Sequence, residues 1–174
     1  MAGEDRAEVS LTIDVSVGAE GWKRLDSPAK LAGDAILAAI EASGIALQPE
    51  TEISVLLCDD AFIQTLNRKW RGIDKATNVL SFPAIHDAAK RGLLGDIAIA
   101  FETAAKEAAA AGISLRDHTA HLLVHGLLHL AGYDHEGMEE AETMEKIERA
   151  ALSRLGVAGP YAAAPVEATT AANE

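Results

Sequence analysis

Apolar and polar residues follow two different periods along the chain, and these periods predict where strands and helices form. Residues 9–17 alternate at every second position, which is typical of a strand with one buried face. Residues 52–58 are almost continuously apolar, as in a strand that is covered on both faces. Two more strands are predicted at 78–82 and at 93–101, and Pro83 ends the strand at 78–82.

Helical periodicity and capping residues predict five helices around these strands. The expected helices cover 28–43, about 60–70, 102–112, a segment that begins after Ser114, and 137–155. In the second helix we expect Asp59 to be the N-cap and Phe62, Ile63 and Leu66 to be buried. Asn78 is expected in an exposed turn that follows this helix.

Four strands and about five helices predict an α+β fold, with a single mixed four-stranded sheet that the helices cover. The sheet is expected to support the helix after Ser114 from behind and to leave its front open as a cleft. We expect one domain over residues 1–156. Residues 157–174 are rich in Ala and Pro and are expected to form a disordered tail.

The composition is that of an ordinary globular protein, with 49% hydrophobic and 24% charged residues. The sequence has no apolar run of the roughly 18–20 residues that cross a bilayer, and its N-terminus lacks a signal pattern. The single cysteine, Cys58, lies in an apolar run and is expected to be reduced and buried. We therefore expect a cytoplasmic protein without a membrane partner.

The formal net charge of −12 argues against a protein that coats nucleic acid by general attraction. The charge is uneven, because residues 64–91 carry six Lys or Arg against two Asp, whereas residues 136–149 carry six Glu. A local basic surface on an acidic protein is compatible with this distribution. Composition therefore leaves the partner open.

The chemistry of the chain is concentrated in residues 118–135, HTAHLLVHGLLHLAGYDH, which hold five of its six histidines. The first four of these histidines fall within about 80° of one helical face. Apolar residues cover the opposite side of the helix. The histidine face is therefore expected to line a metal site.

Spacing indicates which histidines share one ion. His125 and His129 are one helical turn apart, so their side chains can converge on a metal. Gly132 is expected to end the helix with a positive φ, which lets the chain carry His135 back to the same ion. The motif H-x-x-x-H-x-x-G-x-x-H therefore predicts one zinc ion per chain, held by His125, His129 and His135.

The remaining histidines are assigned lesser roles. His118 is expected to hydrogen-bond a neighbour or touch substrate, and His121 to support a metal ligand. His86 stands alone and is assigned no role. For proton transfer during a reaction, His118, His121 and Asp134 are the candidates.

Three protein ligands leave the fourth position of a zinc ion to water, which predicts metal-dependent hydrolysis. The helix is metzincin-like in its spacing, but Gly126 stands where the metzincin motif has its glutamate base. A guanidinium beside the metal would suit a phosphate substrate. Arg71 is the candidate for that role, although an isolated arginine is more often a solvated surface charge.

Three segments carry a resemblance to a known family. HGLLHLAGYDH at 125–135, LNRKWRGIDKATNVLSF at 66–82 and LGDIAI at 94–99 resemble the YbeY family of bacterial endoribonucleases. The similarity runs from about residue 9 to residue 155. The family usually has proline at the position of Ala76, but this difference removes no chemical group.

The resemblance implies a single-strand-specific, metal-dependent endoribonuclease that acts in maturation of the 3′ end of 16S ribosomal RNA and in ribosome quality control. It also implies zinc ligands at His125, His129 and His135 and a functional arginine at Arg71. An acidic protein could reach RNA poorly alone, so the ribosome or a small-subunit ribosomal protein is an expected partner. Two alternatives stay open: a hydrolase of peptide or amide bonds, and a non-enzymatic ribosome-assembly factor that zinc only stabilises.

Overall fold

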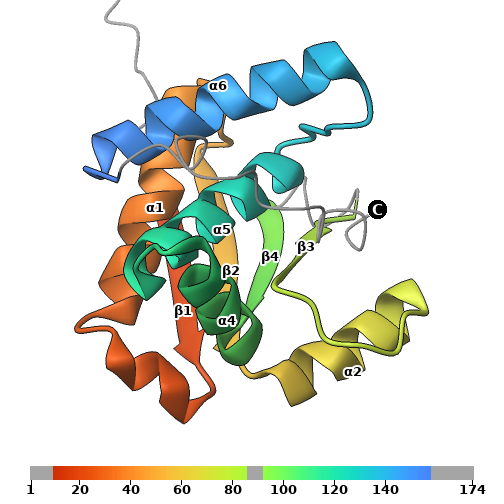
Figure 1. The fold of residues 1–174 in the computed structure, drawn as a ribbon. Coiled ribbons are helices and arrows are strands. Elements are labelled where there is room, and N and C mark those ends of the chain that lie inside the picture. The colour runs from red at the N-terminus through yellow and green to blue at the C-terminus, as the bar shows by residue number, and fades with distance from the viewer. Residues whose placement is uncertain (1–9, 86–91, 158–174) are drawn as a thin grey trace, which may run out of the picture.

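The computed structural model describes residues 10–85 and 92–157, and these residues form an α+β fold (Figure 1). In chain order the elements are β1 (Ser10–Val17), the 3-10 helix η1 (Glu20–Arg24), α1 (Pro28–Ser43), β2 (Glu50–Cys58), α2 (Asp60–Arg71), β3 (Val79–Pro83), β4 (Leu93–Ala100), α4 (Phe101–Ala111), α5 (Leu115–Leu130) and α6 (Met138–Arg154). The predicted strands and helices are therefore confirmed, with ends that differ by one or two residues.

The four strands form one mixed sheet, as predicted, and their order in it is β1-β2-β4-β3. β1, β2 and β4 run parallel, whereas β3 pairs with β4 in the antiparallel direction. Helix α1 makes the crossover between the parallel strands β1 and β2. β3 is short and lies at the edge of the sheet, which agrees with the proline at its end.

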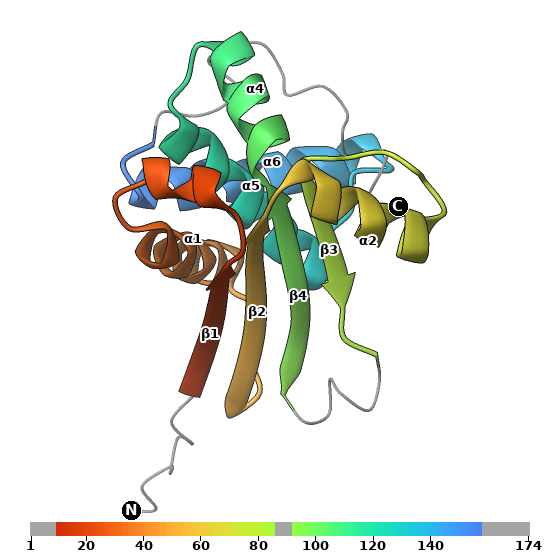
Figure 2. The ribbon, with the colours of Figure 1, turned by 90° about the horizontal axis from the view of Figure 1, so that it is seen from below.

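Helices α1 and α5 cover one face of the sheet, and α6 packs on these two helices and completes the main core (Figures 1 and 2). Helix α5 lies between β3 and β4 on one side and α1, α4 and α6 on the others. Twelve of its sixteen residues are buried as a result. The predicted support by the sheet is correct, but the expected open cleft along the histidine face is wrong, because neighbouring helices cover that face as well.

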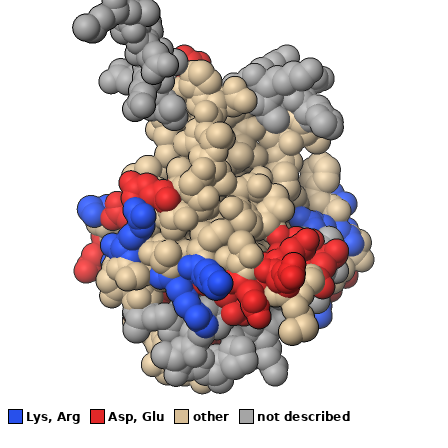
Figure 3. Space-filling model, turned by 90° about the horizontal axis from the view of Figure 1, so that it is seen from above, with Lys and Arg blue, Asp and Glu red and all other residues tan. Residues whose placement is uncertain are grey.

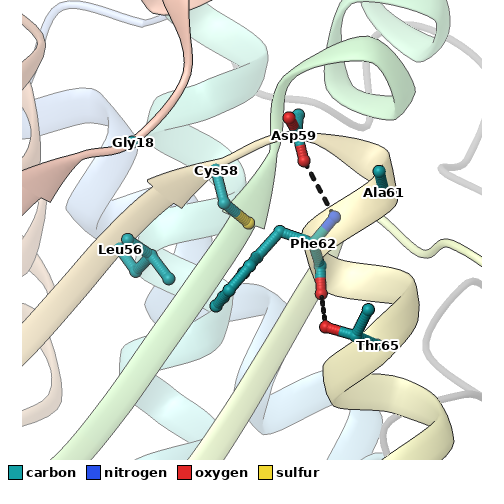
Figure 4. Close-up of a pocket in the computed structure, with 7 residues that line it drawn as sticks. All are labelled: Gly18, Leu56, Cys58, Asp59, Ala61, Phe62 and Thr65. Carbon is teal, nitrogen blue, oxygen red and sulfur yellow. Dashed lines mark hydrogen bonds between the residues drawn. The ribbon is translucent and has the colours of Figure 1, made fainter.

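The second face of the sheet is covered only in part. Helix α2 lies over the ends of β3 and β4 (Figure 2) and packs there on a smaller apolar cluster that includes Ile63 and Leu80. Phe62 is 46% exposed, so its predicted burial is wrong. The reason is that α2 covers too little of the sheet to bury the whole turn. Phe62 lines a pocket of about 460 Å³. Figure 4 shows its side chain in this pocket together with Leu56 and Cys58.

Capping groups account for the helix starts. The Asp59 carboxylate accepts a hydrogen bond of 2.8 Å from the backbone N–H of Phe62, and the Ser114 hydroxyl accepts one of 3.0 Å from that of Asp117. Asn78 is buried rather than exposed, because its side chain donates to Glu107 and accepts from a backbone N–H. The predicted exposed position of Asn78 is therefore wrong.

The packed part of the chain extends slightly beyond the predicted domain. Val157, at the predicted start of the tail, is buried and packs on the main core. The rest of the predicted tail and His86 lie outside the described residues. Within residues 10–85 and 92–157, no helix is both long and apolar enough to cross a membrane.

Cys58 is buried at the end of β2, where its thiol donates to the backbone carbonyl of Ile99 over 3.5 Å. Burial, and to a lesser extent the charge of Asp59, raises the pKa of the Cys58 thiol to about 12. Because the thiolate is the reactive form, native Cys58 should resist alkylation at pH 8. Mass spectrometry after iodoacetamide treatment should detect labelling only in denaturant, and fast labelling of the native protein would contradict this burial.

Candidate metal centre

The end of α5 is shaped to return the chain toward the helix. After Leu130 the backbone turns at Gly132, which has a φ of 95°, as the sequence predicts. The turn is closed by hydrogen bonds from the Gly132 N–H to the carbonyl of His129 and from the Tyr133 N–H to that of Leu128. This turn brings His135 next to the two histidines of the last helical turns.

The three predicted ligands are brought together. Nε2 of His125 and Nε2 of His129 are 2.9 Å apart, and one ring nitrogen from each of His125, His129 and His135 lies within 4.8 Å of the others. Nitrogens that share a tetrahedral zinc ion are about 3–3.5 Å apart. His125 is buried and the other two are half-buried, so a small ion can be enclosed while one side stays accessible.

Carboxylates hold two of the imidazole rings from behind. Nδ1 of His125 is 2.7 Å from Oε1 of Glu148, and Nδ1 of His135 is 3.1 Å from Oδ1 of Asp134. Asp134 also accepts a 2.7 Å hydrogen bond from the backbone N–H of His135. In both rings the carboxylate engages Nδ1, which leaves Nε2 as the nitrogen for an ion.

The protonation state of the cluster suits metal binding. Burial, followed by the neighbouring imidazoles of His125 and His135, lowers the pKa of His129 to about 4. The hydrogen bonds from His135 hold the pKa of Asp134 below its usual value. At neutral pH His129 is therefore a neutral imidazole, which is the form that binds a metal. Asp134 is an ionised carboxylate, which is the form that can orient the His135 ring. The residues present fit a zinc ion.

His118 and His121 do not join this cluster but bind acidic side chains inside the protein. Nε2 of His118 lies 3.4 Å from a carboxylate oxygen of Glu107, and Nε2 of His121 lies 3.1 Å from Oε2 of Glu148. Both histidines are buried. Hydrogen bonding to a neighbour agrees with one of the two expected roles of His118. His121 contacts Glu148, which in turn contacts His125, and its ring also lies edge-on to the His125 ring at a centroid distance of 6.4 Å.

Gly126 faces the sheet. A Cβ atom at this position would lie 3.0 Å from Ile97 and 3.4 Å from Val79, and the Ser81 hydroxyl donates to the Gly126 carbonyl over 3.0 Å. A glutamate side chain would therefore meet β3 and β4. The protease base is absent here because close packing of α5 on the sheet requires a small residue.

Arg71 is the last residue of α2 and binds the edge strand β3. Its Nη2 donates to the carbonyl of Ser81 over 2.8 Å, and its guanidinium lies 5.6 Å from the centre of the Phe82 ring. Because the hydroxyl of Ser81 binds Gly126, the same strand residue contacts both Arg71 and the helix that carries His125. The structure thus connects the predicted arginine to the metal-binding helix through β3.

Arg71 also lines a groove on the open face of the sheet, with a volume of about 640 Å³. Trp70 and Phe82 line the same groove, and Trp70 is 62% exposed. Asp14 and Asp96 are also part of the lining. The groove therefore combines exposed aromatic surface and a guanidinium with acidic groups.

Charged side chains are unevenly distributed on the surface. Figure 3 shows a larger group of acidic side chains on one side of this face, and acidic and basic side chains mixed on the other. A pocket next to the cluster of His125, His129 and His135 is lined by acidic side chains, which are Asp134, Glu136, Glu139 and Glu140. The basic side chains of α2, which are Arg68, Lys69 and Arg71, provide the local basic surface that the sequence allowed.

Glu148 is the site residue that the sequence patterns did not single out, because it is one of six glutamates in an acidic segment. A signal was nevertheless present. Glu148 follows Met144 by four residues and precedes Ala151 by three, so it falls on the apolar face of α6. A carboxylate on a buried face needs a hydrogen-bonding partner. The histidine-rich helix, which directly precedes α6 in the sequence, can supply one.

The fold and the site together define a class: an α+β protein with a three-histidine centre at an accessible helix end, which is a candidate metallohydrolase. The sequence model of the family described as endoribonuclease YbeY matches residues 23–156. A relative named endoribonuclease YbeY from Methylocella silvestris is 54% identical, over 86% of this chain and 85% of the relative. The chain belongs to the YbeY family, which confirms the predicted resemblance.

Other relatives agree with this assignment. A protein with the same name from Rhodospirillum rubrum is 51% identical, over 88% of this chain and 82% of that protein. A Thermotoga maritima protein with a known solution structure is 23% identical and superimposes with a TM-score of 0.53, covering 90% of this chain and 100% of that one. The latter shares the fold.

The packing of Gly126 predicts that a larger side chain is not tolerated there. Gly126→Glu should lower the free energy of unfolding by about 3 kcal/mol or more, because it overpacks the sheet contact and buries a carboxylate. Gly33→Glu is the matched control, since Gly33 is helical and no atom lies within 4 Å of the place that a Cβ would occupy there. Urea unfolding should separate the two variants, and equal stability would disprove the assigned contact.

The low pKa of His129 predicts a pH dependence of the metal-free protein. Between pH 6.5 and about 4 the unfolded chain binds more protons at this residue than the folded chain does. The free energy of unfolding should therefore fall by on the order of 1 kcal/mol from pH 6.5 to pH 5. Well above pH 6.5, His129 is neutral in both states and should add nothing to the pH dependence of stability. Urea unfolding in chelator measures it. His129→Gln should flatten the profile, and an unchanged slope would contradict the assignment.

Proposed function

We propose that this protein is a metal-dependent endoribonuclease that cuts single-stranded RNA, with one zinc ion held by His125, His129 and His135. The observation that carries the proposal is the convergence of the three imidazoles in a chain of this family. The relatives' shared name, endoribonuclease YbeY, supports the reaction type. Close packing at Gly126 disfavours the protease alternative, because that helix face has no room for the glutamate base.

The chain's own residues prepare the site for hydrolysis. A bound zinc ion would supply a water of lowered pKa and polarise a phosphoryl oxygen. His125 is oriented by Glu148 and His135 by Asp134, so the ring nitrogens stay aimed at one point. Of the three candidates for proton transfer, His118 and His121 are buried, whereas Asp134 lies at the accessible turn.

Arg71 is proposed to bind a phosphate of the RNA. Its contacts with the Ser81 carbonyl and the Phe82 ring hold the guanidinium at the edge of β3. A guanidinium offers five N–H donors, so it can bind phosphate oxygens while it keeps a contact to the protein. The exposed ring of Trp70 beside it offers a surface on which an unpaired base can stack.

We infer further that the RNA is ribosomal and that the protein acts in the cytoplasm, in maturation of the 3′ end of 16S ribosomal RNA and in ribosome quality control. A net charge of −12 opposes the capture of free RNA by general attraction. The ribosome or a small-subunit ribosomal protein is therefore proposed to present the strand. The basic side of α2 would face the RNA, away from the acidic patch beyond His135.

The proposal predicts which variants lose cleavage of an unstructured, end-labelled RNA. A chelator should abolish cutting by the zinc-loaded protein, and His129→Ala should lose both zinc and cutting. Arg71→Ala should keep zinc but cut about 100-fold more slowly, because it lacks the group that offsets phosphate charge. Arg154→Ala removes an exposed arginine that pairs with Glu41 and should cut at the wild-type rate.

Metal analysis and gel-based cleavage rates measure these effects. Wild-type cleavage by an Arg71→Ala protein that retains zinc would disprove the role of Arg71. Casein is the parallel substrate, and its cutting in place of RNA would identify a peptidase. A zinc-loaded protein that cuts neither substrate would identify a non-enzymatic assembly factor.

A further inference from the structure

Glu148 is a carboxylate in an interior position. Its side chain is 2% exposed, and it is the one acidic residue that is buried within the described ranges 10–85 and 92–157. Met144, Ala151 and Leu152 of the same helix are buried around it, so its backbone is anchored in the core. An ionised carboxylate in such a place is costly unless it is paired and hydrogen-bonded.

The two oxygens of Glu148 serve different histidines of α5. Oε1 lies 2.7 Å from Nδ1 of His125, and Oε2 lies 3.1 Å from Nε2 of His121. Both carboxylate oxygens therefore face imidazole nitrogens, and the carboxylate is fixed directly behind the His125 ring.

We propose that Glu148 is a positioning residue of the metal centre: it accepts the Nδ1–H of His125 and thereby keeps Nε2 of that ring directed at the ion. His121 serves this role indirectly, because it holds the second oxygen of Glu148. The proposal rests on the metal site described under Proposed function, and it adds α6 to the elements on which that site depends. Neither the family motif nor the ligand spacing contains this residue.

The geometry favours this role over a purely structural contact between two helices. The 2.7 Å bond of Glu148 to His125 is shorter than the 3.1 Å bond of Asp134 to His135, and Asp134 is more exposed. The carboxylate in the core is therefore the stronger constraint on a ligand. A purely structural contact would lower the stability of the metal-free protein and leave its affinity for zinc unchanged.

Zinc affinity separates the two roles. The dissociation constant of full-length protein should be measured by competition with a chromophoric chelator at one fixed pH. Glu148→Gln keeps the shape but removes the charge, and it should weaken zinc binding about 10-fold. Glu148→Leu removes the acceptor and should weaken binding about 100-fold. Glu142→Gln, an exposed position of α6, is the matched control and should bind zinc as the wild type does.

A spectroscopic readout tests the orientation directly. In the metal-free wild type, the ¹⁵N shifts of His125 should report the tautomer protonated at Nδ1. In Glu148→Leu the two tautomers should become mixed. Because the leucine variant could fail to fold, circular dichroism is recorded for each protein, and Glu148→Gln then decides the outcome.

The failures of the two proposals are distinguishable. A folded wild-type protein that binds no zinc would overturn the metal centre and the role of Glu148 with it. Zinc binding by the wild type with equal affinity in the folded Glu148 variants would overturn the positioning role alone, even if those variants unfold more easily. Weaker zinc binding with an unchanged tautomer in the leucine variant would likewise overturn it.

Discussion

Helix α5 carries His118, His121 and His125 into a tightly packed interior, and each of these polar rings needs a hydrogen-bonding partner. Burying an imidazole without a hydrogen-bonding partner destabilises the fold by more than the packing of its ring stabilises it. Glu107 and Glu148 meet this need at Nε2 of His118 and of His121, and Glu148 also engages Nδ1 of His125. The positions of α4 and α6 around α5 are thus tied to the histidines as much as to the apolar core.

The sheet imposes the second constraint on the same helix. Gly126 allows α5 to approach β3 and β4 closely, and the Ser81 hydroxyl fixes that approach with a hydrogen bond. Ser81 also accepts from Arg71 on the other side of the edge strand. One short strand therefore connects a basic residue of α2 with the helix that bears His125, although the two lie far apart in the sequence.

Much of the architecture was predictable, because local patterns and tertiary packing agree. The caps at Asp59 and Ser114 and the positive φ of Gly132 follow from local chemistry that sequence displays directly. Phe62 and Asn78 were predicted wrongly because burial depends on how much of the sheet α2 covers and on whether Glu107 is within reach. Those are properties of neighbours that lie far away in the chain.

The sequence by itself determined which three histidines come together, since His125 and His129 are one helical turn apart and a glycine ends the helix before His135. It also indicated the family and the mixed sheet. Only the tertiary structure decided which buried side chain contacts the His125 ring. Glu148 lies 23 residues from His125 and reaches it because α6 packs across α5. Spacing along one element encodes which side chains share a face, whereas contacts between elements depend on how the whole core is packed.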